Sequence, residues 1–162
     1  EFYKKKRKTF QFGRFSRFDS RYDNIKEFQV TDIEEGSANN AVYGFFQTIA
    51  KASPSFDIVK LKNLDAECLY TMETLAQSID IREFGSLIKH VSPVKLNPNG
   101  IIMNEAGKHY RLPACVESYT AYGSMLEGGI RLNQRYAGTA YNDKIRLLSD
   151  FGSELYIIEK TE

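Results

Sequence analysis

Residues 40–50, NAVYGFFQTIA, decide the fold class. Apolar side chains stand at both odd and even positions of this stretch, as Val42, Tyr43 and Phe45 illustrate. A strand that is apolar on both parities is typical of the centre of a sheet whose two faces are both covered. The breaker ASPS at 52–55 ends the pattern. We therefore predict a central strand here and expect other strands on both sides of it.

The flanking segments predict short antiparallel strands. In IKEFQVTD at 25–32, Phe28 and Val30 share one face, and in FDIVKLKNL at 56–64, Val59 and Leu61 alternate with lysines. CLYTM at 68–72 returns after a turn, and EGGIRL at 127–132 and ELYIIEK at 154–160 supply later strands. Such a series favours a sandwich or an open barrel. The predicted class is mostly β, an antiparallel β-sandwich with Greek-key-like order.

One segment changes period. DIREFGSLIKHVSP at 80–93 has apolar residues at helical spacing, with Asp80 as a cap, Glu83 in the capping-box position and Pro93 as the stop. We predict an inserted helix over 81–91. After the turn NPNG at 97–100, the sequence predicts strands near 101–104, 108–112 and 117–121.

The opening stretch, FYKKKRKTFQFGRFSRF at 2–18, is basic and aromatic. Residues 1–18 hold seven Lys or Arg against one Glu, a net charge of +6, whereas the remaining chain carries −5. A nucleic-acid-binding domain usually spreads its positive field over a face, and disordered basic arms are poor in large apolar groups. We expect a short helix with Phe2, Tyr3 and Phe10 on one side, solvated lysines on the other, and a break at Gly13.

Length and composition fit one domain of 162 residues with enough apolar side chains for a core. The sequence has no apolar run of membrane-spanning length and opens without a signal peptide. Cys68 and Cys115 lack framework spacing, so we expect free thiols, which favours a cytoplasmic protein. Two His residues give no metal-site pattern.

The residues alone indicate no active site. His90 falls in the last turn of the predicted helix, where a cation meets the negative end of the helix dipole. Cys115 has no nearby base, Gly128-Gly129 lacks the context of a phosphate loop, and DFGS at 150–153 matches a kinase tripeptide only by spelling. We assign no catalytic, cofactor-binding or metal-binding residue.

Several stretches of the sequence carry a resemblance when they are taken in order. Residues 2–18 run from Phe-Tyr-Lys into Gln-x-Gly-x-Phe-x-Arg, here Gln11, Gly13, Phe15 and Arg17, and are followed by Phe28-Gln29-Val30, LKNLD at 61–65 and YGSMLEGGIRL at 122–132. These stretches resemble family 36 glycoside hydrolases, the α-galactosidases: in order, the end of the catalytic barrel, the WQVV strand, the Leu-Lys-Gly-Leu-Asp-Pro turn and the Ser-Gly-x-x-Leu-Met-x-x-Gly-Leu segment. The sequence from residues 80–96 through residues 137–160 looks like the C-terminal part of a bacterial branch.

The chain also departs from the family pattern. Asn63 stands where the family usually has Gly, and Ala66 where it has Pro. The turn should therefore be looser, or Asn63 should adopt the left-handed conformation that Asn tolerates. Residues 72–117 are longer than the usual link and carry the extra helix.

The resemblance implies a two-part organisation. Residues 1–12 would be a remnant of the preceding barrel helix, and residues 13–162 the C-terminal β-sandwich domain. The parent would be a retaining α-galactosidase that removes terminal α-galactose without a cofactor. The family's two catalytic aspartates lie on the barrel, and no Asp of this chain aligns with either, so this segment alone should be inactive.

The implied partner is the catalytic barrel, and the chain would be associated with an α-galactoside substrate only as part of the parent enzyme. We expect the chain to bind neither nucleic acid nor a membrane, and a homo-oligomer is an open alternative. The alternative is a carbohydrate-binding or assembly module. Its candidate stacking residues are Tyr110, Tyr119, Tyr122, Tyr136 and Tyr141.

Overall fold

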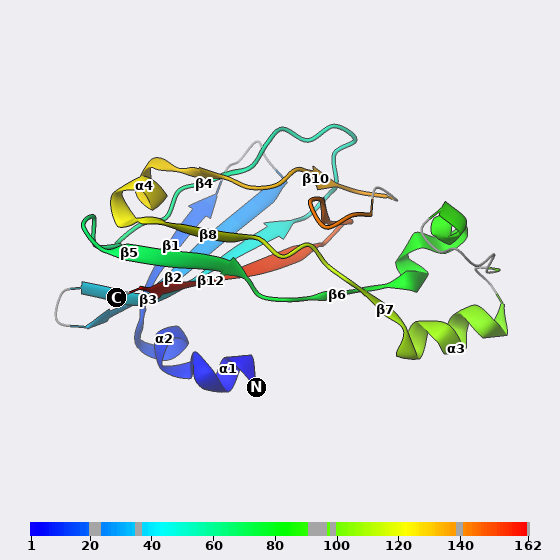
Figure 1. Cartoon of the computed structure of the whole chain (residues 1–162), viewed down its shortest axis with the longest axis horizontal. Helices are drawn as coiled ribbons and strands as arrows, with labels where there is room; N and C mark the ends of the chain where they lie inside the picture. The colour runs from blue at the N-terminus through cyan, green and yellow to red at the C-terminus, as the bar shows by residue number, and fades with distance from the viewer. Residues whose placement is uncertain (20–23, 35–36, 91–96, 98–99, 139–140, 162) are drawn as a thin grey trace.

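A six-stranded antiparallel sheet forms the centre of the molecule (Figure 1). The computed structural model describes residues 1–161 except 20–23, 35–36, 91–96, 98–99 and 139–140. In spatial order the sheet consists of β1 (Arg14–Asp19), β2 (Ile25–Glu34), β3 (Ser37–Gln47), β12 (Ser153–Lys160), β5 (Leu69–Thr74) and β8 (Ser118–Tyr122). The C-terminal strand β12 thus lies between β3 and β5, so segments distant in sequence meet at the centre of the sheet.

A second layer of short strands covers one face of this sheet. It contains the antiparallel pair β4 (Ile58–Val59) and β9 (Ile130–Arg131), the parallel pair β10 (Arg135–Tyr136) and β11 (Arg146–Leu147), and the helix α4 (Gly123–Gly128). Figure 1 shows this layer above the sheet. The main core lies between the layers and includes Tyr43, Phe45, Leu61, Met72, Leu126, Leu132, Tyr156 and Ile158. The predicted mostly β, sandwich-like class is confirmed.

The predicted central strand is also confirmed. Residues 41–45 of β3 are buried, and the strand pairs with β2 on one side and β12 on the other. The register places Tyr43 opposite Tyr156 on the inner face, which points to the second layer, and Val42 opposite Ile157 on the outer face. Apolar residues of both parities are needed because both faces are covered here.

The turn at Asn63 has the predicted left-handed backbone, with φ of 57°. Before it, Val59 and Leu61 are buried and Lys60 and Lys62 are exposed, as the alternation predicts, although only residues 58–59 pair as a strand. Both cysteines are free thiols, which confirms that prediction.

The first residues form two short helices, α1 (Phe2–Lys5) and α2 (Arg7–Phe12), which meet at Lys6. Phe10 contacts the rings of Phe2 and Tyr3, with centroids 6.2 and 5.9 Å away, so the aromatic side predicted for this segment is confirmed. Lys6 corrects the expectation that the lysines are all solvated. Its ammonium donates to Glu159 Oε1 at 2.6 Å and to Asn40 Oδ1 at 3.4 Å on the outer face of the sheet.

Gly13 separates α2 from β1, as the sequence predicts. A Cβ at this position would lie 2.4 Å from the carbonyl oxygen of Thr9 and 2.8 Å from that of Thr31. The helix therefore passes so close to β2 that only glycine fits at the junction.

The inserted segment leaves the sandwich through β6 (Ser78–Asp80) and returns through β7 (Arg111–Pro113), with the 3₁₀ helix η1 (Ile81–His90) and the helix α3 (Ile101–His109) between them. Figure 1 shows this lobe beyond the end of the sheet. Its small core contains Ile81, Phe84, Ile88 and Met103. The predicted helix is present, but it is kinked at Gly85, where φ is 51°.

The strand predicted at 101–104 is wrong, because these residues begin α3. Met103 and Gly107, four residues apart, are buried on one side of that helix, and Gly107 lies against the Arg82 side chain. The predicted strand at 108–112 is likewise displaced to residues 111–113, whereas the one at 117–121 corresponds to β8.

Asp80, the last residue of β6, caps η1 as predicted. Its carboxylate accepts from the Arg82 backbone N–H at 2.9 Å, and the Arg82 guanidinium lowers its pKa to about 2. Val91, Pro93 and the side chain of Glu83 lie outside the described part of the chain. No helix among the described residues is long and apolar enough to span a membrane.

Candidate functional site

Five charged residues lie together between the two layers, and we call them the ion cluster. They come from five separate elements or the residues next to them: Asp57 before β4, Glu117 before β8, Arg135 in β10, Arg146 in β11 and Glu154 in β12. All five are buried, and the Arg146 side chain is fully enclosed. Burial of charge on this scale is rare unless the groups are paired.

Arg146 is the centre of the ion cluster. Its Nη1 donates to Asp57 Oδ2 at 2.7 Å and its Nε donates to Glu154 Oε2 at 2.7 Å, while Glu117 Oε2 lies 3.6 Å from Nε. The guanidinium also lies over the Phe45 ring, 4.7 Å from its centroid. Arg146 therefore ties together β11, β12, β3 and the loop before β4.

Arg135 is the second cation. Its Nη2 lies 3.3 Å from Asp57 Oδ1, so Asp57 bridges the two guanidiniums through its two oxygens. Arg135 also stacks over Phe45, at 5.3 Å from the centroid. Phe45 thus presents its ring to both cations, an arrangement that is favourable in a desolvated interior.

Two tyrosines complete the coordination of Glu117. Tyr119 donates to Oε1 at 2.6 Å, Tyr156 donates to Oε2 at 2.8 Å, and the backbone N–H of Asn133 donates to Oε1 at 2.6 Å. Burial, together with the Glu117 charge, raises the pKa of both tyrosine hydroxyls. Both therefore stay protonated and act as donors.

The buried position of Glu154 disfavours the charged form of its carboxyl group. Burial raises its pKa, although Arg146 opposes the shift. Desolvation in a region of low dielectric is the largest cause of the shift, and the charge of Glu117 adds to it.

The ion cluster is a closed network. Retaining glycosidases need two carboxyl groups on either side of a substrate bond. Here the carboxylates face guanidiniums and tyrosines inside the core, where a sugar could not reach them. Its chemistry is therefore that of a structural clamp between layers.

No residue of this ion cluster stands out in the sequence as part of a site, because the five charged positions are far apart along the chain. A usable signal exists in β12: Glu154 shares its parity with Tyr156 and Ile158. An acidic residue on the buried side of a strand implies a buried cation opposite.

The five candidate tyrosines do not form one surface. Tyr119 faces inward onto Glu117, and Tyr141 donates to the Pro113 carbonyl at 3.0 Å. Tyr110, Tyr122 and Tyr136 are exposed, but they lie after α3, at the end of β8 and in β10, respectively. An extended stacking platform for a glycan is not present among them.

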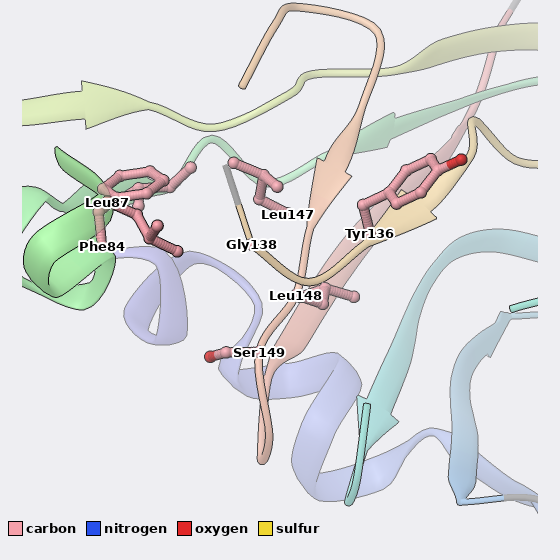
Figure 2. Close-up of a pocket in the computed structure, with 8 residues that line it drawn as sticks. Phe84, Leu87, Tyr136, Gly138, Leu147, Leu148 and Ser149 are labelled. Carbon is pink, nitrogen blue, oxygen red and sulfur yellow. The ribbon is translucent and has the colours of Figure 1, made fainter. Parts of the chain in front are cut away.

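A small cavity lies between η1 and the β10–β11 pair (Figure 2). Its volume is about 80 Å³, and its walls include Phe84, Leu87, Tyr136 and Leu147. Ligand sites usually enclose about 300–1,000 Å³. The cavity is therefore too small for a sugar, and we regard it as a packing gap between the lobe and the sandwich.

The remaining candidates keep their structural interpretations. His90 and His109 are exposed at the ends of η1 and α3. Cys115 is buried, and burial raises the pKa of its thiol, which is typical of an unreactive cysteine. In the part of the chain that the structure describes, no group of His, Cys, Asp and Glu could hold a metal ion.

One protein-family model matches the chain. The model for the glycosyl hydrolase family 36 C-terminal domain matches residues 34–158. No curated protein matches the chain. Among solved structures, the α-galactosidase of Lactobacillus brevis is similar, with a TM-score of 0.58 and 18% identity over 99% of this chain and 15% of its own.

A family 36 α-galactosidase of Geobacillus stearothermophilus, solved in complex with raffinose, is similar to the same degree. Its TM-score is 0.57, with 18% identity over 99% of this chain and 14% of its own. At this identity the two structures establish the fold alone, and the chain spans about one seventh of their length. The match to the family model covers most of the sandwich, and the chain therefore belongs to the family of glycosyl hydrolase family 36 C-terminal domains.

Proposed function

We propose that the chain is the non-catalytic C-terminal domain of an α-galactosidase that hydrolyses terminal α-galactosides. Its role is to pack against the catalytic barrel and to keep that barrel folded. The family match over residues 34–158 carries the proposal. The ion cluster supports it, because Arg and Tyr side chains engage its buried carboxylates.

Two parts of the proposal concern organisation and location. Residues 1–12 would belong to the last barrel helix and residues 13–162 to the domain itself, with Gly13 as the junction. A cytoplasmic location is consistent with free Cys68 and Cys115, because disulfides persist mainly in oxidising compartments.

A chromogenic α-galactoside assay tests the proposal. This chain alone should show no turnover, and the longer polypeptide that contains it should hydrolyse the substrate. Turnover by this chain that survives further purification would contradict the non-catalytic role. A longer polypeptide that folds but hydrolyses no α-galactoside would contradict the assignment to an α-galactosidase.

The alternative of a carbohydrate-binding module has weaker support, because the exposed tyrosines lie on separate elements. Titration calorimetry with melibiose and raffinose should give no binding heat with this chain. Saturable binding would favour the alternative. An assembly module would instead show a mass in solution that rises with concentration.

A further inference from the structure

The outer face of the six-stranded sheet changes character from one edge to the other. One line of cross-strand partners runs across it: Phe15, Val30, Val42, Ile157, Glu73 and Ser118. A neighbouring line of cross-strand partners on the same face consists of Phe28, Gly44 and Leu155. The face is thus aromatic and aliphatic over β1, β2, β3 and β12, and polar over β5 and β8.

The polar half of the outer face, over β5 and β8, has the residue pattern of a sheet face in water. Thr71 of β5 lies opposite Thr120 of β8, and their hydroxyls are 3.2 Å apart. Glu73 and Ser118 form the neighbouring exposed pair. An antiparallel sheet with one face in water alternates apolar and polar residues in this manner. This half provides an internal reference for the other half.

The apolar half carries three stacked rings, which we call the aromatic row: Phe15, Phe28 and Phe46. Adjacent centroids are 5.9 and 5.7 Å apart, and the ring planes differ by 15° and 25°. The Phe28 ring lies directly over Gly44, where a Cβ would come within 2.2 Å of its Cε1. The row is therefore a pre-formed surface and not a set of loose side chains.

Much of this aromatic row faces solvent in the chain as described. Phe15 is 62% exposed and Phe46 is 38% exposed. The α1–α2 segment covers only the other end of the face, where Lys6 reaches Asn40 and Glu159 and where Val30 and Val42 are buried. A contiguous exposed apolar patch of this kind marks an interaction site or an aggregation hazard.

We propose that the aromatic row docks the catalytic barrel of the longer polypeptide, an inference that rests on the proposed function. The chain covers only 15% and 14% of the two similar α-galactosidases, so such an enzyme has a large partner tethered to this domain. The α1–α2 segment lies at the adjacent end of the same face and would lead the barrel onto it. Tethering gives a high effective concentration, which favours this occupant over a second copy.

The surroundings of the row indicate the kind of surface that it fits. Arg17 and Lys26 share the outer face, because they lie opposite Phe28 and Phe46, respectively, in the register. A complementary barrel surface would be apolar at its centre and polar at its rim, as in other protein interfaces.

Hydroxyl-radical footprinting of the longer polypeptide, read by mass spectrometry, tests this inference. Phe15 and Phe46 should be labelled severalfold less than Phe56, which is 53% exposed beside β4 in the opposite layer. The protection should not change with protein concentration. Labelling of Phe15 as fast as that of Phe56 would overturn the proposal, and protection seen only at high concentration would assign the row to a second copy instead.

Substitutions provide an independent readout. In the longer polypeptide, Phe15→Gln and Phe46→Gln should each lower the melting temperature, and Phe56→Gln is the matched control for loss of an exposed ring. Equal effects at all three positions would overturn the docking role. If the longer polypeptide hydrolyses an α-galactoside but Phe15 and Phe46 are labelled as fast as Phe56, the docking surface alone is refuted. If Phe15 and Phe46 are protected from labelling but no α-galactoside is hydrolysed, the proposed function alone is refuted.

Discussion

The two faces of the six-stranded sheet differ in the side chains that they carry and in how far these are buried. The inner face encloses the ion cluster, in which the buried Asp57 and Glu154 both accept hydrogen bonds from Arg146. The outer face carries the ion pair of Lys6 with the largely exposed Glu159, and part of it is a row of phenylalanines in which Phe15 and Phe46 are exposed. The inner face is buried within this chain, whereas Phe15 and Phe46 on the outer face are exposed.

The difference between the two faces predicts how substitutions on each face change the stability of this chain. Buried ion pairs add little net stability, but each partner is costly to remove, because the other is left uncompensated. An exposed aromatic row contributes little to the chain that carries it until another surface covers it. Substitutions on the two faces should therefore have very different effects, and four predictions test the contrast.

The largest effect is expected for Arg146→Met. The substitution leaves three buried carboxylates without their central cation, and breaking a buried pair in this way costs about 3–5 kcal/mol. Urea unfolding of this chain measures the loss. A loss below about 1 kcal/mol, the usual value for an exposed pair, would mean that the ion cluster is open to solvent.

The second prediction compares two carboxylates of the ion cluster. Asp57→Asn should destabilise more than Glu154→Gln, because Asp57 contacts both guanidiniums and Glu154 is the group whose charge the interior disfavours. Each amide keeps the shape of the acid that it replaces. The reverse order in urea unfolding would contradict the central place of Asp57 between the two guanidiniums.

The second prediction also includes the pH dependence of stability, which concerns Glu154 alone. The pKa of Glu154 is raised in the fold, so its ionisation lowers the stability of the wild type as pH rises above the ordinary carboxyl range. Glu154→Gln removes this loss. The difference in unfolding free energy between the wild type and this variant should therefore narrow from acidic to neutral pH, and a widening difference would indicate a lowered pKa.

The third prediction concerns the helical segment on the outer face. Phe10→Ala should cost about 1 kcal/mol, because its half-buried ring contacts Phe2 and Tyr3. Lys6→Gln should cost less, because its partner Glu159 is largely exposed, and the loss should shrink in high salt. Lys5→Gln, at an exposed neighbouring position, is the control. A larger loss for Lys6→Gln than for Phe10→Ala would mean that charge holds this segment in place.

The smallest effect is expected on the aromatic row. In this chain alone, Phe15→Gln should change the unfolding free energy by less than about 0.5 kcal/mol, as exposed substitutions usually do. Urea unfolding at the conditions used for Arg146→Met gives a direct comparison. A loss as large as that of a core substitution would show that this chain buries Phe15 by itself.

Local sequence predicted the elements whose side chains match the burial or the backbone conformation at their own positions. The strand predicted at 40–50 is apolar on both parities because both faces of β3 are covered. Asn63 could be predicted to have a left-handed backbone because Asn tolerates this conformation better than most residues do. The run Ile101-Ile102-Met103 was misleading. Its first two residues are exposed on α3, so apolar character there does not report a strand.

The ion cluster could not be predicted, because its members come together only through the order of the sheet. Asp57 and Arg146 are 89 residues apart. Each of them, taken alone, is consistent with an ordinary surface charge. The position of Lys6 was missed for the same reason, since its partner Glu159 lies 153 residues away on β12. Arg146 and Lys6 also each contact a carboxylate of β12, Glu154 and Glu159, respectively.

A structure of the longer polypeptide tests the central claim most directly. The account predicts that a catalytic barrel lies against Phe15, Phe28 and Phe46, with the Thr71–Thr120 half of the same face left in solvent and the ion cluster unchanged. A barrel that instead contacts the Thr71–Thr120 half or the second layer, with the aromatic row still exposed, would contradict it.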